Sequence, residues 1–530
     1  MNTASRLVPP AQAALVAALS NPRCYPHPVD RVEVVETHIS WVLLSGDFAY
    51  KIKKAVALGF LDFSTLARRR AFCDDELRLN RRLAPELYLE VVAITGTSLA
   101  PRFGGNGEAI EYAVKMARFP QDALLDRRLA EARLPPELID RLAEAVADFH
   151  GRVSRATPGD GFGTPAAVWE PMAQNFSQLR ERLPAAAAPR LDDLEAWSRQ
   201  RHGELAGPLA ARLHEGWVRE CHGDLHLGNI ALVGDRLQIF DCIEFNPNLR
   251  WIDVLSEIAF LTMDLEDRGR ADYGHRLLNR YLEGTGDYGG LPLLAFYQVY
   301  RAMVRAKVAA IRAAQEESGA RTADLATCDQ YLAYAARAAT PGEPRLLLLH
   351  GLAGSGKTWL AQGLLEKLGA IRLRSDIERK RLHGLAPLAA SDSTLDGGIY
   401  DSTATAATYS RLVDLARQVL AAGYQVVVDA ACLKTWQRDA FRNLAAELGV
   451  PFAILACTAP DAVLRGRLAK RAAAGGDASE ADQAVLEHQI RVREPLTPAE
   501  EGCCLAIDTS ASFPEDLPQR LCRVRVPGIH

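Results

Sequence analysis

A short apolar run followed by a glycine-rich loop constrains the fold of this chain more than any other feature. Residues 346–349 are four consecutive leucines, and residues 351–358 read GLAGSGKT. Glycines allow the tight turn that points backbone N–H groups at phosphate oxygens, and the dipole of the following helix adds positive potential there. The pattern GxxxxGK[ST] between a buried strand and a helix therefore predicts a phosphate-binding loop in an α/β domain.

Most positions of this loop have an expected role in nucleotide binding. The lysine reaches the β- and γ-phosphates of a nucleoside triphosphate, and the threonine offers its hydroxyl to Mg²⁺. The residues expected to bind the nucleotide are Gly351, Ala353, Gly354, Ser355, Gly356, Lys357 and Thr358. Because such loops also serve GTPases, motors and transport ATPases, the reaction must be inferred from the residues around it.

Two strand ends place carboxylates at the edge of the predicted sheet where ligands of such sheets bind. Asp376 follows the expected strand 371–374, and Asp429 ends the apolar run 426–428. A carboxylate at Asp376 can accept the proton of a hydroxyl that attacks the γ-phosphate, or it can cap the helix that begins beside it. Asp429 stands where a Mg²⁺ ligand is expected.

A second cluster of chemistry-bearing residues lies far upstream. Residues 221–229 read CHGDLHLGN, and a short expected strand pair then ends in Asp241. Phosphoryl transfer needs one carboxylate that orients and deprotonates a hydroxyl, here Asp224, and ligands that hold Mg²⁺, here Asn229 and Asp241. A short hairpin between the last two residues brings them together, which predicts a second phosphoryl-transfer site.

The sequence TPGEP at residues 340–344 separates two parts with different patterns. Two prolines around a glycine end the preceding helix-rich region, so we expect one domain over residues 1–340 and another over residues 341–530. Strand patterns dominate residues 1–117 and helical patterns residues 118–340, which favours an α+β domain with two lobes and a cleft. The second domain alternates strands and helices, which favours an α/β fold with a mostly parallel sheet.

The segment CHGDLHLGN with the strand-ending aspartate resembles the aminoglycoside phosphotransferase and choline kinase branch of the protein-kinase-like fold. The resemblance implies that Asp224 is the catalytic base and that Asn229 and Asp241 are metal ligands. This sequence departs from the pattern after Asp241, where it reads CIE instead of Phe-Gly. The glutamate of that segment, Glu244, could be a further ligand, although a structural role in the core is the favoured interpretation.

The same resemblance places an ATP lysine on the third strand, where residues 49–51 read AYK. Lys51 is the implied ATP lysine, and Lys53, which points to the same face of the strand, is the alternative. Glu76 on the following helix is the implied partner. No glycine-rich loop lies between the first two strands, where residues 37–40 read THIS, so phosphate binding by backbone N–H groups is expected to be weaker here.

The second domain resembles the AAA_33-type P-loop kinases, a group similar to gluconate kinase, polynucleotide 5′-kinase and the zeta-toxin kinases. The segments SDIERKRLHG, VVVDAACLK, ILACTAPDAVLRGRLAKR and ASEADQAVLEHQ carry this resemblance. It implies Asp376 as the base, Arg379 as a neighbouring substrate or phosphate contact, and Arg467 and Arg471 as lid arginines. Solvated surface charges are the alternative reading of the two lid arginines.

The order of the two domains resembles a family of bacterial fused proteins described as aminoglycoside phosphotransferase/ATP-binding proteins. The stretches VVETHISWVLLSGDFAYKIKK and LRWIDVLSEIAFLTMDL carry this resemblance. Arg301, Arg305 and Lys307 on one predicted helix could bind an anionic substrate, although a solvated helix surface is the favoured interpretation.

Composition excludes several classes of function for this chain of 530 residues. A net charge of -4 argues against a sequence-independent nucleic-acid binder, and 48% hydrophobic with 24% charged residues is typical of a globular protein. No uncharged apolar run approaches the ~20 residues that span a bilayer, so we expect no membrane contact. Ten scattered cysteines without a CxxC pair favour a reduced, cytoplasmic chain.

These features together predict a tandem kinase that uses ATP and Mg²⁺. Each domain is expected to transfer the γ-phosphoryl group to a hydroxyl of a small-molecule acceptor, sugar-like or aminocyclitol in character. Two alternatives stay open: one catalytic domain gated by a partner domain that only binds a nucleotide or ligand, and a kinase of the zeta-toxin or polynucleotide type.

Overall fold

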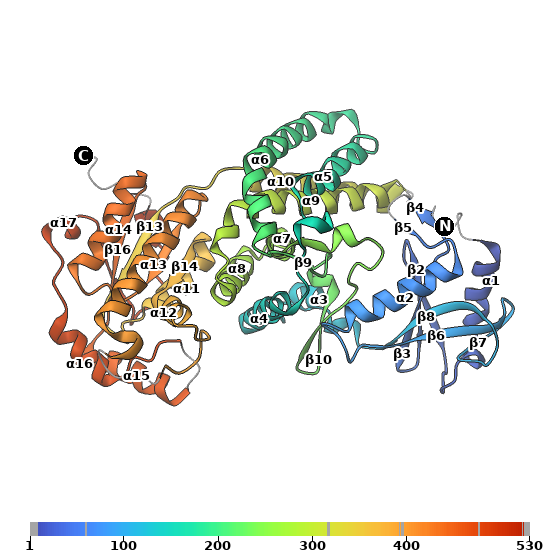
Figure 1. The fold of residues 1–530 in the computed structure, drawn as a ribbon, viewed down its shortest axis with the longest axis horizontal. Helices are drawn as coiled ribbons and strands as arrows, with labels where there is room; N and C mark the ends of the chain where they lie inside the picture. The colour runs from blue at the N-terminus through green and yellow to red at the C-terminus, as the bar shows by residue number, and fades with distance from the viewer. Residues whose placement is uncertain are drawn as a thin grey trace. The chain divides into compact units, whose positions relative to one another are not determined.

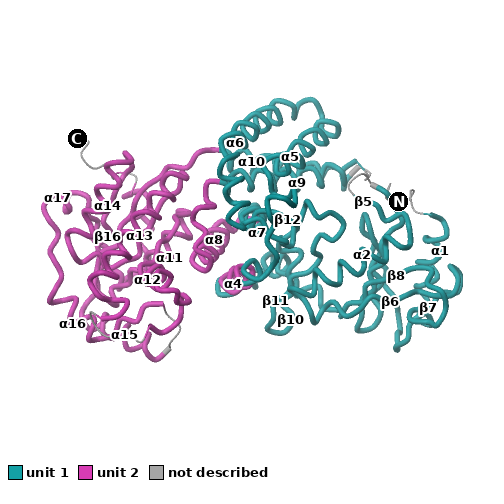
Figure 2. The backbone as a smooth tube through the Cα atoms, in the orientation of Figure 1, with its two compact units in different colours: residues 1–138, 148–267, 293–339 teal, residues 139–147, 268–292, 340–530 magenta. Residues whose placement is uncertain are grey.

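The computed structural model describes residues 9–58, 61–314, 318–391, 393, 397–474, 478–521 and 523. The chain forms two compact units, which Figure 2 shows in different colours. The first unit contains residues 1–138, 148–267 and 293–339, and the second contains residues 139–147, 268–292 and 340–530.

The N-terminal part of the first unit is a six-stranded antiparallel sheet in the order β1-β2-β3-β8-β6-β7 (Figure 1). Its strands are β1 (Val32–Glu36), β2 (Ser40–Ser45), β3 (Phe48–Lys53), β6 (Tyr88–Thr97), β7 (Ala100–Phe103) and β8 (Ala109–Ala117). Helix α2 (Leu66–Asn80) begins at the N-cap Thr65 and packs against β6 and β8. Leu43, Tyr50 and Ile52 form part of the core, so β3 is anchored by its alternate side chains.

The rest of the first unit is mainly helical. Its long helices are α5 (Pro165–Arg180), α6 (Ala188–His214), α7 (Val254–Asp267), α9 (Leu291–Ala313) and α10 (Ser318–Ala338). The antiparallel hairpin β10 (Ile230–Val233) and β11 (Arg236–Ile239) interrupts the helices, as the sequence predicts. Every residue from Val254 to Leu265 in α7 is buried, which places this helix in the interior.

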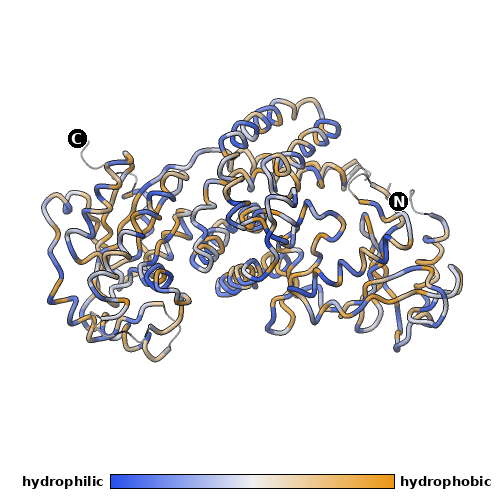
Figure 3. The backbone as a smooth tube through the Cα atoms, viewed as in Figure 1, coloured by the Kyte–Doolittle hydropathy of each residue, from blue (hydrophilic) through white to orange (hydrophobic). Residues whose placement is uncertain are grey.

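The second unit is built on a five-stranded parallel sheet in the order β14-β15-β13-β16-β17. The strands are β13 (Leu346–His350), β14 (Ile371–Arg374), β15 (Val426–Asp429), β16 (Phe452–Thr458) and β17 (Cys504–Asp508). The leucines of β13 and valines of β15 are fully buried and coloured as hydrophobic in Figure 3. The predicted layers are therefore confirmed: an α+β domain, with an antiparallel sheet and a helical part, is followed by an α/β domain with a parallel sheet.

Helix α8 (Ala271–Thr285) belongs to the second unit although it precedes residue 340. The Asn279 side chain donates to the carbonyl of Ala370 (3.1 Å) and accepts from the N–H of Arg372 (2.7 Å) at the start of β14. The Arg372 guanidinium in turn pairs with the buried carboxylate of Glu283 at 2.7 Å. The side chains of α8 therefore complete the hydrogen bonding of the β14 backbone.

The sequence predicts neither a membrane-spanning helix nor disulfide bonds. None of the helices within the described ranges is long and apolar enough to cross a membrane. The nine described cysteines all carry free thiols, and seven of them are buried.

Candidate active sites

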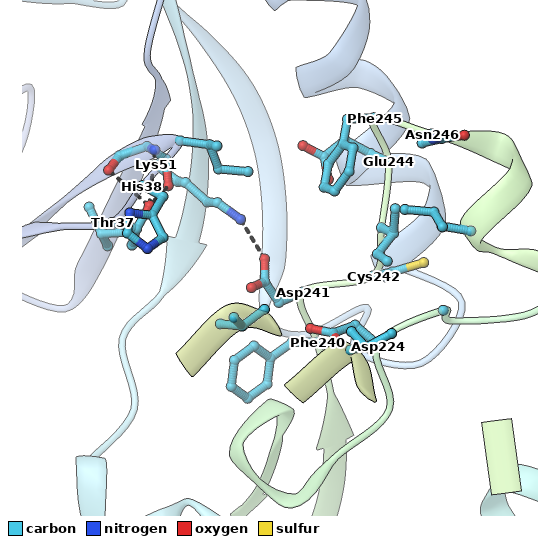
Figure 4. A pocket seen from close by; sticks show the side chains of 18 of the residues that line it. Thr37, His38, Lys51, Asp224, Phe240, Asp241, Cys242, Glu244, Phe245 and Asn246 are labelled. Atoms are coloured by element: carbon cyan, nitrogen blue, oxygen red, sulfur yellow. Dashed lines mark hydrogen bonds and ion pairs between the residues drawn. The ribbon is translucent and has the colours of Figure 1, made fainter. Parts of the chain in front are cut away.

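A cavity of about 1580 Å³ lies in the first unit. Its walls come from the β1–β2 turn, strand β3, the loop at residues 223–224, the segment at residues 240–249, and helices α5 and α9. Figure 4 shows Lys51 of β3 on this cavity together with Asp224 and Asp241, which lie before and after the β10–β11 hairpin.

Lys51 and Lys53 lie on the same face of β3, and the structure gives them different surroundings. Lys51 lines the cavity, and its ammonium pairs with Glu76 of α2 at 2.8 Å and with Asp241 at 2.5 Å. Burial alone would lower the pKa of Lys51, but Asp241 and Glu76 together raise it well above its usual value. Lys53 is almost fully buried and pairs with Glu76 at 2.5 Å and with Glu244. Lys51 is therefore the lysine that can reach a ligand in the cavity.

The loop after Cys221 places Asp224 beside Asn229 and His226. The amide of Asn229 donates to the Asp224 carbonyl at 3.0 Å and to its carboxylate at 3.2 Å. The His226 imidazole lies 3.5 Å from the same carboxylate. Burial opposes ionisation of Asp224, but the neighbouring His226 outweighs it and holds the pKa of Asp224 well below its usual range. Asp224 is therefore a carboxylate at neutral pH.

Asp241 is held in an unusual backbone conformation at the end of the hairpin. Its φ of 63° lies in the left-handed region, which is rare outside glycine. The backbone N–H of Asp241 donates to the Tyr88 hydroxyl at 3.2 Å, and the next N–H, of Cys242, donates to Asn80 at 2.9 Å. Two side chains of the small lobe therefore fix the direction of the Asp241 carboxylate.

Sequence reasoning missed the residue that anchors the loop carrying Asp224. Glu257 of α7 is fully buried and accepts hydrogen bonds from the N–H groups of His222 (3.1 Å) and Gly223 (2.6 Å). The His150 imidazole also contacts it at 2.9 Å. Burial opposes ionisation of Glu257, yet these partners lower its pKa to about 2. The apolar residues on both sides of Glu257, in the stretch VLSEIAFL of α7, were the available signal.

The interpretation of Arg301 as a solvated helix residue is wrong. This arginine is buried, and its guanidinium donates to the carbonyls of Gly223 (2.9 Å) and Ser256 (3.1 Å). Arg301 therefore fixes the same loop from α9, because the carbonyl it binds directly precedes Asp224. Arg305 contacts the Tyr331 hydroxyl at 3.3 Å, whereas Lys307 lines the cavity.

The glycine-rich loop of the second unit joins β13 to α11 (Lys357–Leu368) as predicted. Gly354 and Gly356 have φ values of 77° and 82°, which residues other than glycine rarely adopt. A Cβ on Gly354 would lie 2.7 Å from the carbonyl of Leu464, so only glycine fits there. The Lys357 ammonium donates to the loop carbonyls of Gly351 (3.0 Å) and Leu352 (2.9 Å). Burial lowers the pKa of Lys357.

Ser355, Ala353 and Thr358 of this loop and the helix after it have different surroundings. The Ser355 hydroxyl is buried and has no hydrogen-bond partner among the described residues. The N–H of Ala353 is already used, because it donates to Gln489 of α16 (Gln483–Val492) at 2.7 Å. Thr358 lies in the exposed first turn of α11.

The two carboxylates predicted at the strand ends lie where β14 and β15 end. One Asp429 oxygen is buried and makes no hydrogen bond within the described chain, and the Arg374 guanidinium lies 3.9 Å from it. Asp376 lies in the first turn of α12 (Ser375–Leu382), whose N-cap is Arg374, so Asp376 is not the cap. Burial raises the pKa of Asp376, and nearby Asp429 adds to this.

The predicted lid arginines and Arg379 all make hydrogen bonds to backbone carbonyls. Arg467 donates to the carbonyls of Gly354 (3.3 Å) and Thr509 (2.6 Å), so it touches the glycine-rich loop. Arg471 donates to the carbonyl of Ala481 at 2.6 Å. Arg379 donates to the carbonyl of Ile399 at 2.8 Å, and its guanidinium lies 4.9 Å from the centre of the Tyr400 ring.

Comparison with solved structures shows limited overall similarity. A choline kinase from Cryptosporidium parvum Iowa II is 9% identical, and the match covers 62% of this chain and 95% of that chain with a TM-score of 0.39. The APS kinase CysC of Mycobacterium tuberculosis, in complex with AMPPNP and APS, is 23% identical, and the match covers 34% of this chain and 98% of that chain with a TM-score of 0.24.

Family models and curated relatives cover most of the chain. Residues 60–297 match the model of the Phosphotransferase enzyme family, and residues 346–496 match that of an AAA domain. The uncharacterized proteins Rv2004c of Mycobacterium tuberculosis (strain ATCC 25618 / H37Rv) and Mb2027c of Mycobacterium bovis are each 33% identical over 470 residues, which is 87% of this chain and 91% of theirs. The chain therefore belongs to the family of these mycobacterial proteins, and in it a phosphotransferase domain precedes a P-loop kinase-type domain.

Proposed function

We propose that each domain transfers the γ-phosphoryl group of ATP to a hydroxyl of a small-molecule acceptor. The observation that carries the proposal is the arrangement around one cavity of a paired lysine, Lys51, and two carboxylates, Asp224 and Asp241. A lysine and a carboxylate-bound metal ion can bind phosphates, while a second carboxylate can activate an alcohol.

In the first domain, Asp224 orients the acceptor hydroxyl and takes its proton as the new bond forms. The hydroxyl oxygen bonds to the γ-phosphorus, and the bond from that phosphorus to the β,γ-bridging oxygen breaks, so ADP leaves. Lys51 pairs with the phosphates of the nucleotide. Asn229 and Asp241 would hold Mg²⁺, which when bound neutralises charge on the phosphates. An amide oxygen and a carboxylate suit this hard cation.

In the second domain, the glycine-rich loop and Lys357 would bind the phosphates. The buried Ser355 hydroxyl and Asp429 oxygen, which make no hydrogen bond within the described chain, support a polar ligand there, because buried polar groups rarely lack one. Thr358 and Asp429 would hold Mg²⁺. Asp376 is the proposed base, and its raised pKa suits proton transfer better than that of an exposed aspartate. Arg467 and Arg471 are the proposed lid residues.

The test uses the full-length chain with Asp224→Ala and Asp376→Ala, singly and together. A library of metabolites and aminoglycosides is screened for ATP-dependent gain of one phosphate by mass spectrometry. We expect each single variant to lose one transfer activity and the double variant to lose both. Asp193→Ala, an exposed residue of α6, is the control and should retain both. Unchanged transfer in the double variant would refute the proposal.

One observation favours a second function, in which the first domain binds nucleotide and gates the other without catalysis. The N–H groups of Thr37 and Ser40 in the β1–β2 turn are used within the turn itself, at 2.9 and 3.0 Å. They are therefore not free to hold a γ-phosphate. Tight Mg·ATP binding that depends on Lys51, together with unaltered transfer in the Asp224→Ala variant, would favour this function.

A further inference from the structure

The cavity of the first unit continues beyond the proposed reaction residues, between α5 and α9. The α9 side chains that line it lie at helical spacing, so one face of this helix forms a wall. α5 supplies the facing wall. Apart from Arg301, which holds the loop before Asp224, the residues of these walls with an amide or cationic side chain are Gln174, Asn175, Gln178, Arg182 and Lys307.

Asn175 is the first sign that a ligand belongs in this part of the cavity. Only 1% of its surface is exposed, and neither the oxygen nor the nitrogen of its amide has a hydrogen-bond partner among the described residues. A buried amide without partners is unfavourable, and an apolar residue of the same size would fill the space better. Its amide can both donate and accept, which matches a ligand hydroxyl.

Lys307 is the second sign. It lines the cavity half-buried, and no carboxylate of the described chain lies within ion-pair distance of it. Burial and the nearby Arg182 disfavour its charged form and lower its pKa. Glu181 does not compensate it, because this carboxylate pairs with Arg182 at 3.2 Å. Glu170, the other carboxylate of these walls, lies exposed on α5.

The position of Lys307 relative to the proposed base follows from the geometry of α9. Arg301 binds the carbonyl next to Asp224 at 2.9 Å. Lys307 lies six residues further along the same helix, which corresponds to ~9 Å along its axis. Asp224 and Lys307 both line this cavity, so one small polyhydroxylated molecule in it can contact both side chains.

We propose that the acceptor of the first domain is a polyhydroxylated alcohol that carries an anionic group, a carboxylate or a phosphate. This inference rests on the proposed function. Lys307 pairs with the anionic group, the Asn175 amide exchanges hydrogen bonds with a neighbouring hydroxyl, and the reacting hydroxyl faces Asp224. An anion at Lys307 supplies the negative partner that neither Glu170 nor Glu181 provides, so a neutral or cationic analogue binds more weakly.

The test measures binding by titration calorimetry to the full-length protein saturated with Mg·AMPPNP. The probes are gluconate, glucose 6-phosphate, glucose and glucosamine, so the carboxylate, phosphate, neutral and cationic cases are separated. We expect gluconate, glucose 6-phosphate or both to bind more tightly than glucose. Lys307→Met should weaken this anion binding by at least about tenfold and leave glucose binding unchanged. Lys367→Met, an exposed lysine that pairs with Glu515, should change nothing.

Three results would overturn the inference. They are tighter binding of glucosamine than of both anionic probes, anion binding that Lys307→Met does not weaken, and no binding of either anionic probe. Binding and transfer are separate readouts. If the anionic probes bind in a way that depends on Lys307, but no phosphoryl transfer depends on Asp224, this inference stands and the proposed function fails.

Asn175→Leu provides a second measurement that does not depend on charge. If the amide is kept for a ligand, the apolar substitution should raise the midpoint of thermal unfolding and weaken binding of the hydroxylated probes. A lowered midpoint with unchanged binding would show that Asn175 serves the fold and not the acceptor.

Discussion

Glu257→Gln should destabilise the first unit more than any surface substitution, because this carboxylate holds the loop that carries Asp224. Its pKa falls from an ordinary 4.5 to about 2 in the folded chain. Each pKa unit corresponds to about 1.4 kcal/mol, so the ionised carboxylate stabilises the folded state by about 3 kcal/mol at pH 7. The amide of glutamine has only one acceptor oxygen for the N–H groups of His222 and Gly223, so one of them loses its partner.

The assay is urea unfolding of wild type and Glu257→Gln between pH 7 and pH 3, with hydrogen exchange of residues 221–229 as the local probe. A group with a lowered folded pKa stabilises fully above its unfolded pKa and loses that effect as the pH falls towards the folded value. The difference should therefore be about 3 kcal/mol at pH 7 and roughly half of that at pH 3. Glu86→Gln, which breaks an exposed ion pair with Arg236, is the control and should cost less than about 1 kcal/mol. A difference below about 1 kcal/mol at pH 7, or one that does not shrink with acid, would refute the reasoning.

Lys53→Met should destabilise the first unit by about 3–5 kcal/mol in urea unfolding, because Glu244 would stay buried without a cation. Lys51→Met should instead keep the fold and weaken Mg·ATP binding; the reverse pattern would contradict the assignment of Lys51. Asn279→Ala should destabilise the second unit by about 1–3 kcal/mol, since it leaves two backbone groups near β14 unpaired, whereas the exposed Asn443→Ala should not. Removal of Mg²⁺ with EDTA should weaken nucleotide binding more at the first domain than at the second. Lys357→Ala leaves the first domain's site for this measurement, and Lys51→Met leaves the second domain's site. An equal loss of affinity at both sites would contradict this expectation.

The parts of the molecule that the sequence predicts are those whose signals are local. The glycine-rich loop can be read from eight consecutive residues, and its strand and helix lie where the pattern places them. The loop with Asp224 and Asn229 is similarly contiguous, and their hydrogen bond spans only five residues. In both cases the chemistry needs particular residue types at a fixed short spacing, so the motif can be recognised without knowledge of the fold.

The supporting residues escaped prediction because their partners are distant in the chain. Glu257 binds a backbone N–H that lies 34 positions earlier, and Asn279 binds a carbonyl 91 positions later. In sequence, a glutamate or asparagine within a helix is easily mistaken for a solvated surface residue. The same reason explains the error over Arg301, whose partners are carbonyls on another element. Only burial in the folded chain separates these roles.

On the proposed function, the two domains would bind phosphate by different physical means. In the second unit, the N–H groups of Gly354 and Gly356 make no hydrogen bond within the described chain, and positive φ values turn the backbone into a cradle. In the first unit the corresponding turn uses the N–H groups of Thr37 and Ser40 internally. Under this proposal, the charge of Lys51 and of a Mg²⁺ ion held by Asn229 and Asp241 would contribute more of the nucleotide affinity there than the backbone does. Because salt screens attraction between charges, we expect added salt to weaken Mg·ATP binding at the first domain more than at the second, measured by nucleotide titration of Lys357→Ala and Lys51→Met.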